Sequence, residues 1–124
     1  MARIFLVDDD QPILKIMSQI LQSRGHQAST FTSAEELRPR LAEGPDVLIC
    51  DLRLPGADGL TVAEETRRVS PRTRIVLCSG ADSDELAAAL ERGIVDHAVM
   101  KPWRAADLLG AIESLLATPR AAKG

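Results

Sequence analysis

The chain has 124 residues, of which 45% are hydrophobic and 27% are charged, and its formal net charge is −3. These values are typical of one ordinary globular domain that is long enough to bury a real core. The sequence has no basic cluster that would favour direct nucleic-acid binding and no apolar run long enough to span a membrane.

The first half of the chain alternates short β-type runs with helical patterns. RIFLV (3–7) predicts a strand that is covered on both faces, and Pro12 opens a helical stripe that ends before Gly25. HQASTF (26–31) alternates weakly and predicts an edge strand. Ser33 with Glu36 predicts a capping box for a second helix, and Pro39 should kink or shorten that helix.

The second half continues the same alternation of strands and helices. In chain order, we expect a strand at 46–50, a loop at 51–59, a helix to about Val69, a strand at 74–78, an alanine-rich helix at 83–92, a strand at 96–100 and a last helix with its stripe at 108–116. Five such units predict a doubly wound parallel sheet with helices on both faces and right-handed crossovers.

The two cysteines, Cys50 and Cys78, both lie in apolar runs. Buried free thiols are therefore expected, rather than a disulfide or a metal site. Charged residues begin by Asp8, which does not fit a secretory signal pattern, so the expected location is cytoplasmic.

Polar side chains follow four of the five expected strands. Asp8 and Asp9 come after the first strand, Asp51 after the third, Ser79 after the fourth and Lys101 after the fifth. Ligands of such sheets bind beyond the carboxyl ends of the strands, so we expect these side chains to converge at one edge.

Three carboxylates without histidines or thiolates form a hard, oxygen-rich site. Such a site suits Mg²⁺ or Mn²⁺ better than zinc, and we assign Asp8, Asp9 and Asp51 to it. The simpler alternative is that the acidic run only caps a helix. That interpretation suits Asp10, but it does not explain the other strand ends.

Asp51 is the candidate nucleophile, because a carboxylate beside a divalent cation can attack a phosphoryl group. Lys101 would neutralise charge on the phosphoryl oxygens, and the Ser79 hydroxyl would bind one of them. Taken singly, Lys101 could be a surface lysine and Ser79 a helix-capping hydroxyl. Their joint placement at strand ends favours the functional interpretation.

The segments FLVDDD, DVLICDLRLPGADGL, RIVLCSG and VMKPW resemble the receiver domain of bacterial two-component response regulators, and the similarity covers residues 3–117. The resemblance implies a flavodoxin-like fold with strand order 2-1-3-4-5. It implies that Asp51 is the phosphoacceptor and that the backbone carbonyl of Arg53 joins the three aspartates in the Mg²⁺ shell. It also makes Ser79 the switch hydroxyl and Lys101 the phosphate-binding lysine.

The resemblance further implies a signalling switch that catalyses only its own phosphorylation and dephosphorylation. The donor would be a phosphohistidine on a sensor histidine kinase or a phosphotransfer protein. The output face would be formed by the helix at 83–92, the strand at 96–100 and the last helix, and a homodimer through that face is expected. The receiver domain should span residues 1–118, with 119–124 as a flexible tail or the start of a linker.

The sequence departs from the family pattern at Ala98. Ala98 replaces the aromatic residue that usually couples to the switch hydroxyl, so either His97 or Trp103 substitutes for that residue, or the helix at 83–92 responds by another route. The KPW ending resembles receivers attached to cyclic-dinucleotide phosphodiesterases.

Arg53 and Ala81 should flank the path of an attacking water, so Arg53→Asn is predicted to alter the half-life of the acyl phosphate.

Three other functions are weighed against the receiver. A degenerate receiver that acts only in docking or dimerisation is favoured by Ala98 alone. A phosphatase or phosphotransferase usually needs a carboxylate two residues after the nucleophile, where Arg53 stands. A flavin-binding module needs a Ser/Thr/Gly-rich phosphate loop after the first strand, and DDDQP would repel a phosphate there.

Overall fold

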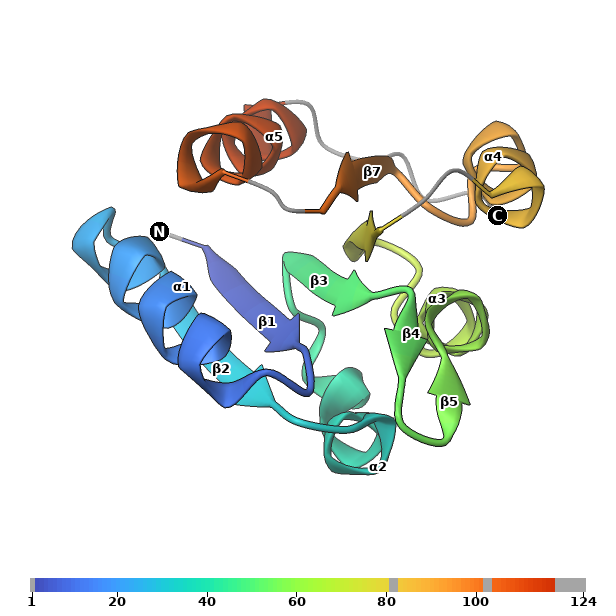
Figure 1. The fold of residues 1–124 in the computed structure, drawn as a ribbon, viewed down its shortest axis with the longest axis horizontal. Helices are drawn as coiled ribbons and strands as arrows, with labels where there is room; N and C mark the ends of the chain where they lie inside the picture. Colours follow the sequence, from blue (N-terminus) through green and yellow to red (C-terminus); the bar gives the residue numbers. More distant parts are fainter. Residues whose placement is uncertain (1, 81–82, 102–103, 118–124) are drawn as a thin grey trace.

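The computed structural model describes residues 2–80, 83–101 and 104–117. Its main sheet is parallel, five-stranded and ordered β2-β1-β3-β6-β7, which confirms the predicted fold and strand order (Figure 1). The bounds of these strands are β1 Arg3–Val7, β2 Gln27–Phe31, β3 Val47–Asp51, β6 Arg74–Ser79 and β7 His97–Met100.

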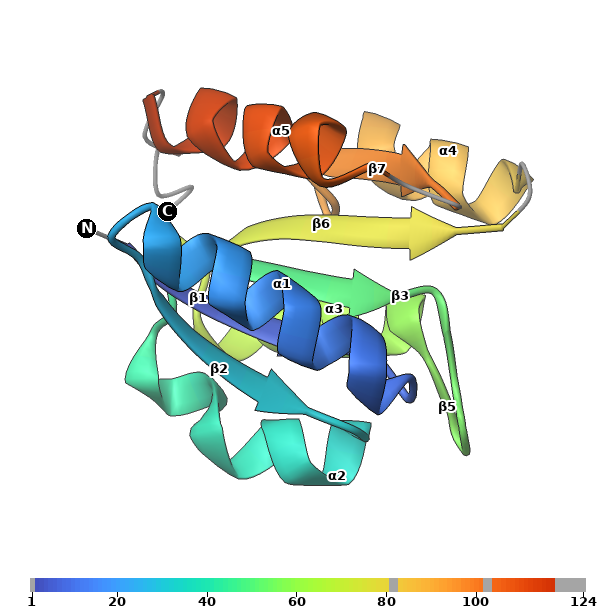
Figure 2. The same ribbon diagram turned by 60° about the vertical axis from the view of Figure 1, so that its left-hand side comes forward.

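Helices cover both faces of this sheet (Figures 1 and 2). On one face lie α1 (Gln11–Ser23) and α5 (Ala105–Ala117). On the other lie α2 (Ala34–Leu37), the 3₁₀ helix η1 (Arg38–Glu43), α3 (Gly59–Val69) and α4 (Asp84–Glu91). None of the helices in the described ranges has the length and apolar character that crossing a bilayer requires.

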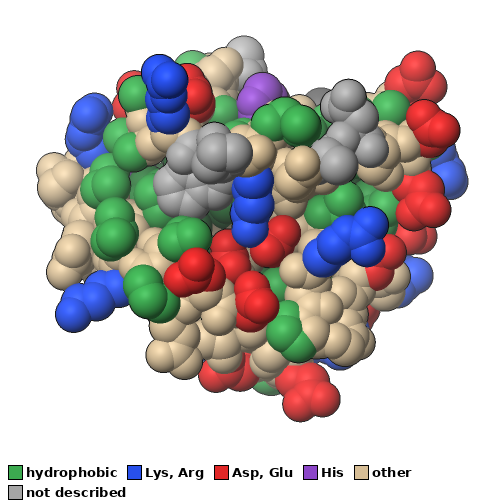
Figure 3. All heavy atoms as spheres, viewed as in Figure 1, with side chains coloured by type: hydrophobic (Ala, Val, Ile, Leu, Met, Phe, Trp, Pro, Cys, Tyr) green, Lys and Arg blue, Asp and Glu red, His purple; other side chains and the backbone are tan. Residues whose placement is uncertain are grey.

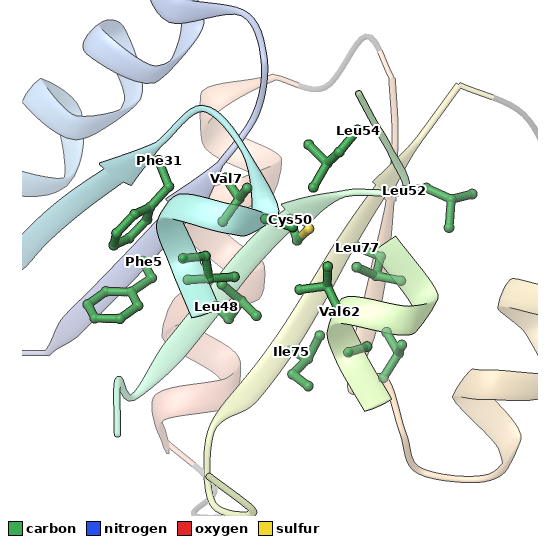
Figure 4. Close-up of a cluster of buried hydrophobic side chains, with 14 of the residues drawn as sticks. Phe5, Val7, Phe31, Leu48, Cys50, Leu52, Leu54, Val62, Ile75 and Leu77 are labelled. Carbon is green, nitrogen blue, oxygen red and sulfur yellow. The ribbon is translucent and has the colours of Figure 1, made fainter. Parts of the chain in front are cut away.

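The sheet separates two hydrophobic cores, because successive strand residues point to opposite faces. Leu48 and Cys50 of β3 join the core under α2, α3 and α4, which also contains Phe5 and Phe31 (Figure 4). Val47 and Ile49 of the same strand join the core under α1 and α5.

The capping and proline signals act as predicted. Asp10 caps α1 by accepting a hydrogen bond of 3.2 Å from the Ile13 N–H. Ser33 caps α2 by accepting from Glu36 at 3.2 Å. The α-helix then stops at Leu37, and the chain continues as η1 with Pro39 in its first turn.

The segment expected to be a loop at 51–59 contains regular structure. A short antiparallel hairpin pairs β4 (Arg53–Leu54) with β5 (Ala57–Asp58), and Pro55 and Gly56 form its turn. Gly56 has φ 70°, a conformation that glycine adopts without strain. Leu54 packs into the core, so the hairpin holds the chain that follows Asp51 against the domain.

The expected tail at 119–124 lies outside the described residues. The two cysteines are free and buried, as predicted. Cys50 and Cys78 lie in different cores, on opposite faces of the sheet.

Candidate functional site

Four strand ends bring the predicted site residues to one edge of the sheet. Asp51 and Ser79 are the last residues of β3 and β6, while Asp8 and Lys101 directly follow β1 and β7. The Lys101 N–H donates to the Ser79 carbonyl at 2.7 Å, which aligns the last two strand ends. Figure 3 shows acidic side chains gathered beside a basic one near the middle of the view.

Three carboxylates form the acidic part of the site. Asp8, Asp9 and Asp51 each offer an oxygen, and these atoms lie within 4.8 Å of one another. Asp8 is buried, Asp51 is half-buried and Asp9 is exposed. The Asp10 N–H donates to Asp8 Oδ1 at 3.0 Å, which fixes the orientation of the buried carboxylate. This all-oxygen donor set fits a hard divalent cation such as Mg²⁺.

Lys101 supplies the positive charge of the site. Its Nζ lies 2.7 Å from Asp51 Oδ2 and 3.4 Å from Asp8 Oδ2. Burial lowers the pKa of Lys101, but the hydrogen bond that Lys101 donates to Asp51 and the charges of Asp51 and Asp8 outweigh burial, so the pKa is raised. The ammonium therefore stays charged between the two carboxylates.

The remaining predicted residues lie around this centre. Ser79 is buried, with 4% of its surface exposed. The side chain of Arg53 is exposed, and its N–H lies 3.4 Å from Asp51 Oδ1. The expected contact between the Arg53 carbonyl and a metal stays a prediction. Ala81 and Trp103 lie outside the described residues.

Ala98 lies on β7, beside the site and not in it. It is half-buried, pairs in register with Leu77 and packs against the core under α3 and α4. Its strand neighbours His97 and Met100 are exposed, the latter by 53%. The position of the missing aromatic residue therefore belongs to the surface that α4, β7 and α5 share.

The thiols near the site do not offer a nucleophile. Burial raises the pKa of Cys78 to about 12, and burial also raises the pKa of Cys50. A thiolate is the reactive form of cysteine, so neither side chain competes with the carboxylate of Asp51 at neutral pH.

Gly59 is a neighbour of the site that the sequence interpretation treated only as a loop residue. It is buried at the start of α3, and its N–H donates to the Leu52 carbonyl at 2.7 Å. Only the close packing of α3 against the end of β3 reveals that Gly59 lies beside the site. The sequence signal for this position is no more than one glycine after a helix cap.

Residues 4–113 match the protein family described as the response regulator receiver domain. The chain belongs to this family. It is thus a receiver domain of two-component response regulators, a family of signalling switches, as the resemblance implied. Receiver domains bind Mg²⁺ at an acidic pocket and interact with histidine kinases or phosphotransfer proteins.

Curated relatives agree with this assignment. The chain is 32% identical over 116 residues to the transcriptional regulatory protein PrrA of Mycobacterium leprae, covering 92% of this chain and 49% of that protein. It is 28% identical over 114 residues to the transcriptional regulatory protein CssR of Bacillus subtilis, covering 91% and 50%. The chain therefore spans about half the length of these relatives.

Solved structures of receiver domains share the fold. A CheY-like receiver domain protein from Methanospirillum hungatei superposes with a TM-score of 0.88 at 27% identity, covering 94% of each chain. The BeF3-activated receiver domain of DrrB superposes with a TM-score of 0.84 at 28% identity, covering 95% of this chain and 99% of that one.

Proposed function

We propose that this receiver domain accepts a phosphoryl group on Asp51 from a phosphohistidine of a sensor histidine kinase or phosphotransfer protein. The observation that carries the proposal is the grouping of Asp51 with Asp8, Asp9 and Lys101 at one edge of the sheet. A half-buried carboxylate that is held 2.7 Å from an ammonium is oriented for attack and shielded from most other partners.

Asp8, Asp9 and Asp51 are the side chains that would hold Mg²⁺ (or Mn²⁺), with the carbonyl of Arg53 as a further ligand. When bound, the ion would neutralise negative charge on the oxygens of the phosphoryl group. The aspartates of this chain provide only oxygen donors, and the Asp10 N–H already fixes the orientation of the Asp8 carboxylate.

The transfer itself is a displacement at phosphorus. A carboxylate oxygen of Asp51 forms the new bond to phosphorus while the bond from phosphorus to the imidazole nitrogen of the donor breaks, and that nitrogen keeps the electron pair. Lys101 then moves its ammonium from the carboxylate to a phosphoryl oxygen, and the Ser79 hydroxyl donates to another.

The new group adds about −1.5 to −2 charge and three acceptor oxygens. Drawing in Ser79 and Lys101 would shift the two strand ends that lead into α4 and α5. Leu86 and Ala89 are the buried residues of α4, so this helix is held by few large side chains. The surface of α4, β7 and α5 is the proposed output face and the proposed homodimer contact.

We also propose that residues 1–118 form the receiver unit and that 119–124 are a flexible tail or the start of a linker. A second candidate is a docking module that is never phosphorylated, which only Ala98 favours. The activities of the longer relatives belong to those proteins.

Beryllofluoride binding, read by the fluorescence of the single tryptophan, tests the proposal. Beryllofluoride mimics a phosphoryl group on a carboxylate, so we expect saturable binding that needs Mg²⁺ and disappears in Asp51→Asn. Arg72→Asn, which alters an exposed arginine outside the site, should bind like the unmodified protein. Mg²⁺ binding without any beryllofluoride binding would instead indicate the docking module.

A further inference from the structure

Gly59 lies in contact with the backbone that carries Asp51. A Cβ atom built on Gly59 would stand 2.5 Å from the Asp51 carbonyl oxygen and 2.8 Å from Leu52 Cα. Both distances are far inside ordinary van der Waals contact. The atoms in the way belong to the backbone, so no flexible side chain can move aside to make room.

The backbone conformation of Gly59 does not itself require glycine. The described glycines with positive φ are Gly25, Gly44, Gly56 and Gly93, and Gly59 is not one of them. Alanine is a better helix former than glycine, so a helix start would ordinarily favour it. The close approach to Asp51 and Leu52 is therefore the reason for glycine at this position.

The strand end beneath Gly59 is held from the other side as well. The Leu52 N–H donates to the Cys78 carbonyl of β6 at 2.8 Å. The Cys50 thiol lies 3.2 Å from the Asp51 carbonyl oxygen, as a weak donor. The backbone of residues 51–52 thus lies between β6 and the first residue of α3, so an atom added to Gly59 presses directly on the strand end that carries Asp51.

We propose that Gly59 is a positioning residue of the phosphoacceptor site, which sets the place of the Asp51 carboxylate relative to Lys101 and Asp8. This inference rests on the proposed function of Asp51. A methyl group at position 59 must displace the Asp51 backbone by about 0.5 Å or more, which exceeds what a reactive constellation tolerates. Displacements of this order lower reaction rates by about 10- to 100-fold.

The test compares Gly59→Ala with two control variants. Gly110→Ala makes the same change in α5, where an added Cβ meets nothing within 4 Å. Asp58→Ala removes the cap of α3, where Asp58 Oδ1 accepts from the Leu60 N–H at 2.8 Å, without placing an atom against Asp51. It therefore weakens the start of the same helix by another route.

Two quantities are measured for each variant: the phosphorylation rate with acetyl phosphate per folded molecule, and the Mg²⁺ dissociation constant by calorimetry. We expect Gly59→Ala to lose about 10- to 100-fold in rate and to bind Mg²⁺ several-fold more weakly, while both controls stay within about twofold of the unmodified protein. A loss of helix stability alone would not change the Mg²⁺ affinity of the folded molecules.

A folded Gly59→Ala with unchanged rate and Mg²⁺ affinity would overturn the inference, and so would an equal loss in Asp58→Ala. Should Gly59→Ala unfold, trimethylamine N-oxide restores compact states, and the same two measurements then apply. If Gly59→Ala refolds and is phosphorylated at the full rate, or if it does not refold at all, Gly59 has a structural role only. Failure of the unmodified protein to react would instead refute the role of Asp51, and the inference with it.

Discussion

At the residue scale, the positive charge of Lys101 holds the carboxylates of the site and also competes with a cation for them. Its Nζ neutralises Asp51 and Asp8 at 2.7 and 3.4 Å, in the place where a divalent cation would neutralise the same carboxylates. We predict that Lys101→Met raises the affinity for Mg²⁺ by about tenfold, because one repulsive charge is removed at short range from the ion.

Calorimetry with Mg²⁺ checks this prediction at low ionic strength, where screening is weak. Arg104→Met is the matched control, since Arg104 is an exposed residue just before α5. A weaker affinity in Lys101→Met would mean that the lysine orients the aspartates more than it repels the cation.

The site residues could be predicted from the sequence because parallel strands end together. Asp8, Asp51, Ser79 and Lys101 each follow or end an apolar run, and one rule of sheet topology unites them. The role of Gly59 could not be predicted in this way, because its contact with Asp51 depends on the angle at which α3 meets the sheet.

At the element scale, α3 is tied to the far end of the sheet by an ion pair that is mostly buried. Arg67 donates to the carboxylate of Asp96 and to the Ile94 carbonyl, while Asp96 also accepts from the Ile75 N–H at 2.8 Å. The side chains of Arg67 and Asp96 are only 14% and 9% exposed. Removing Arg67 takes the opposite charge away from the Asp96 carboxylate, and this is costly even though that carboxylate keeps the Ile75 N–H.

We therefore predict that Arg67→Met lowers the free energy of unfolding by about 3 kcal/mol, measured by urea denaturation. The adjacent exposed Arg68 provides the control, because Arg68→Met should change stability by less than about 0.5 kcal/mol. Equal losses of stability in Arg67→Met and Arg68→Met would contradict a special role of the ion pair between Arg67 and Asp96.

Sequence patterns predicted the type of each major element, and local chemistry explains why. Pro39 shortens α2, and Asp10 and Ser33 start their helices, since each acts within a few residues. The β4–β5 hairpin was missed because each strand has only two residues, which is too short for alternation to appear. The partner of Arg67 was missed because Asp96 is 29 residues away.

At the scale of the whole molecule, the sheet separates two cores and presents the site at one edge. Among the described residues, the core under α2, α3 and α4 and the core under α1 and α5 form separate clusters on the two sides of the strands. A change at the ends of β6 and β7 can therefore reach α4 and α5 on opposite faces. The strand order itself came from family resemblance, because neither periodicity nor spacing decides which strands are neighbours.

The central claim is that Asp51 accepts a phosphoryl group, and intact-protein mass spectrometry tests it most directly. The protein is incubated with acetyl phosphate and Mg²⁺, beside Asp51→Asn and a sample containing a chelator. The account predicts the mass gain of one phosphoryl group in the unmodified protein, and none in the variant or without Mg²⁺. No gain where Mg²⁺ is shown to bind, or an equal gain in Asp51→Asn, would contradict it.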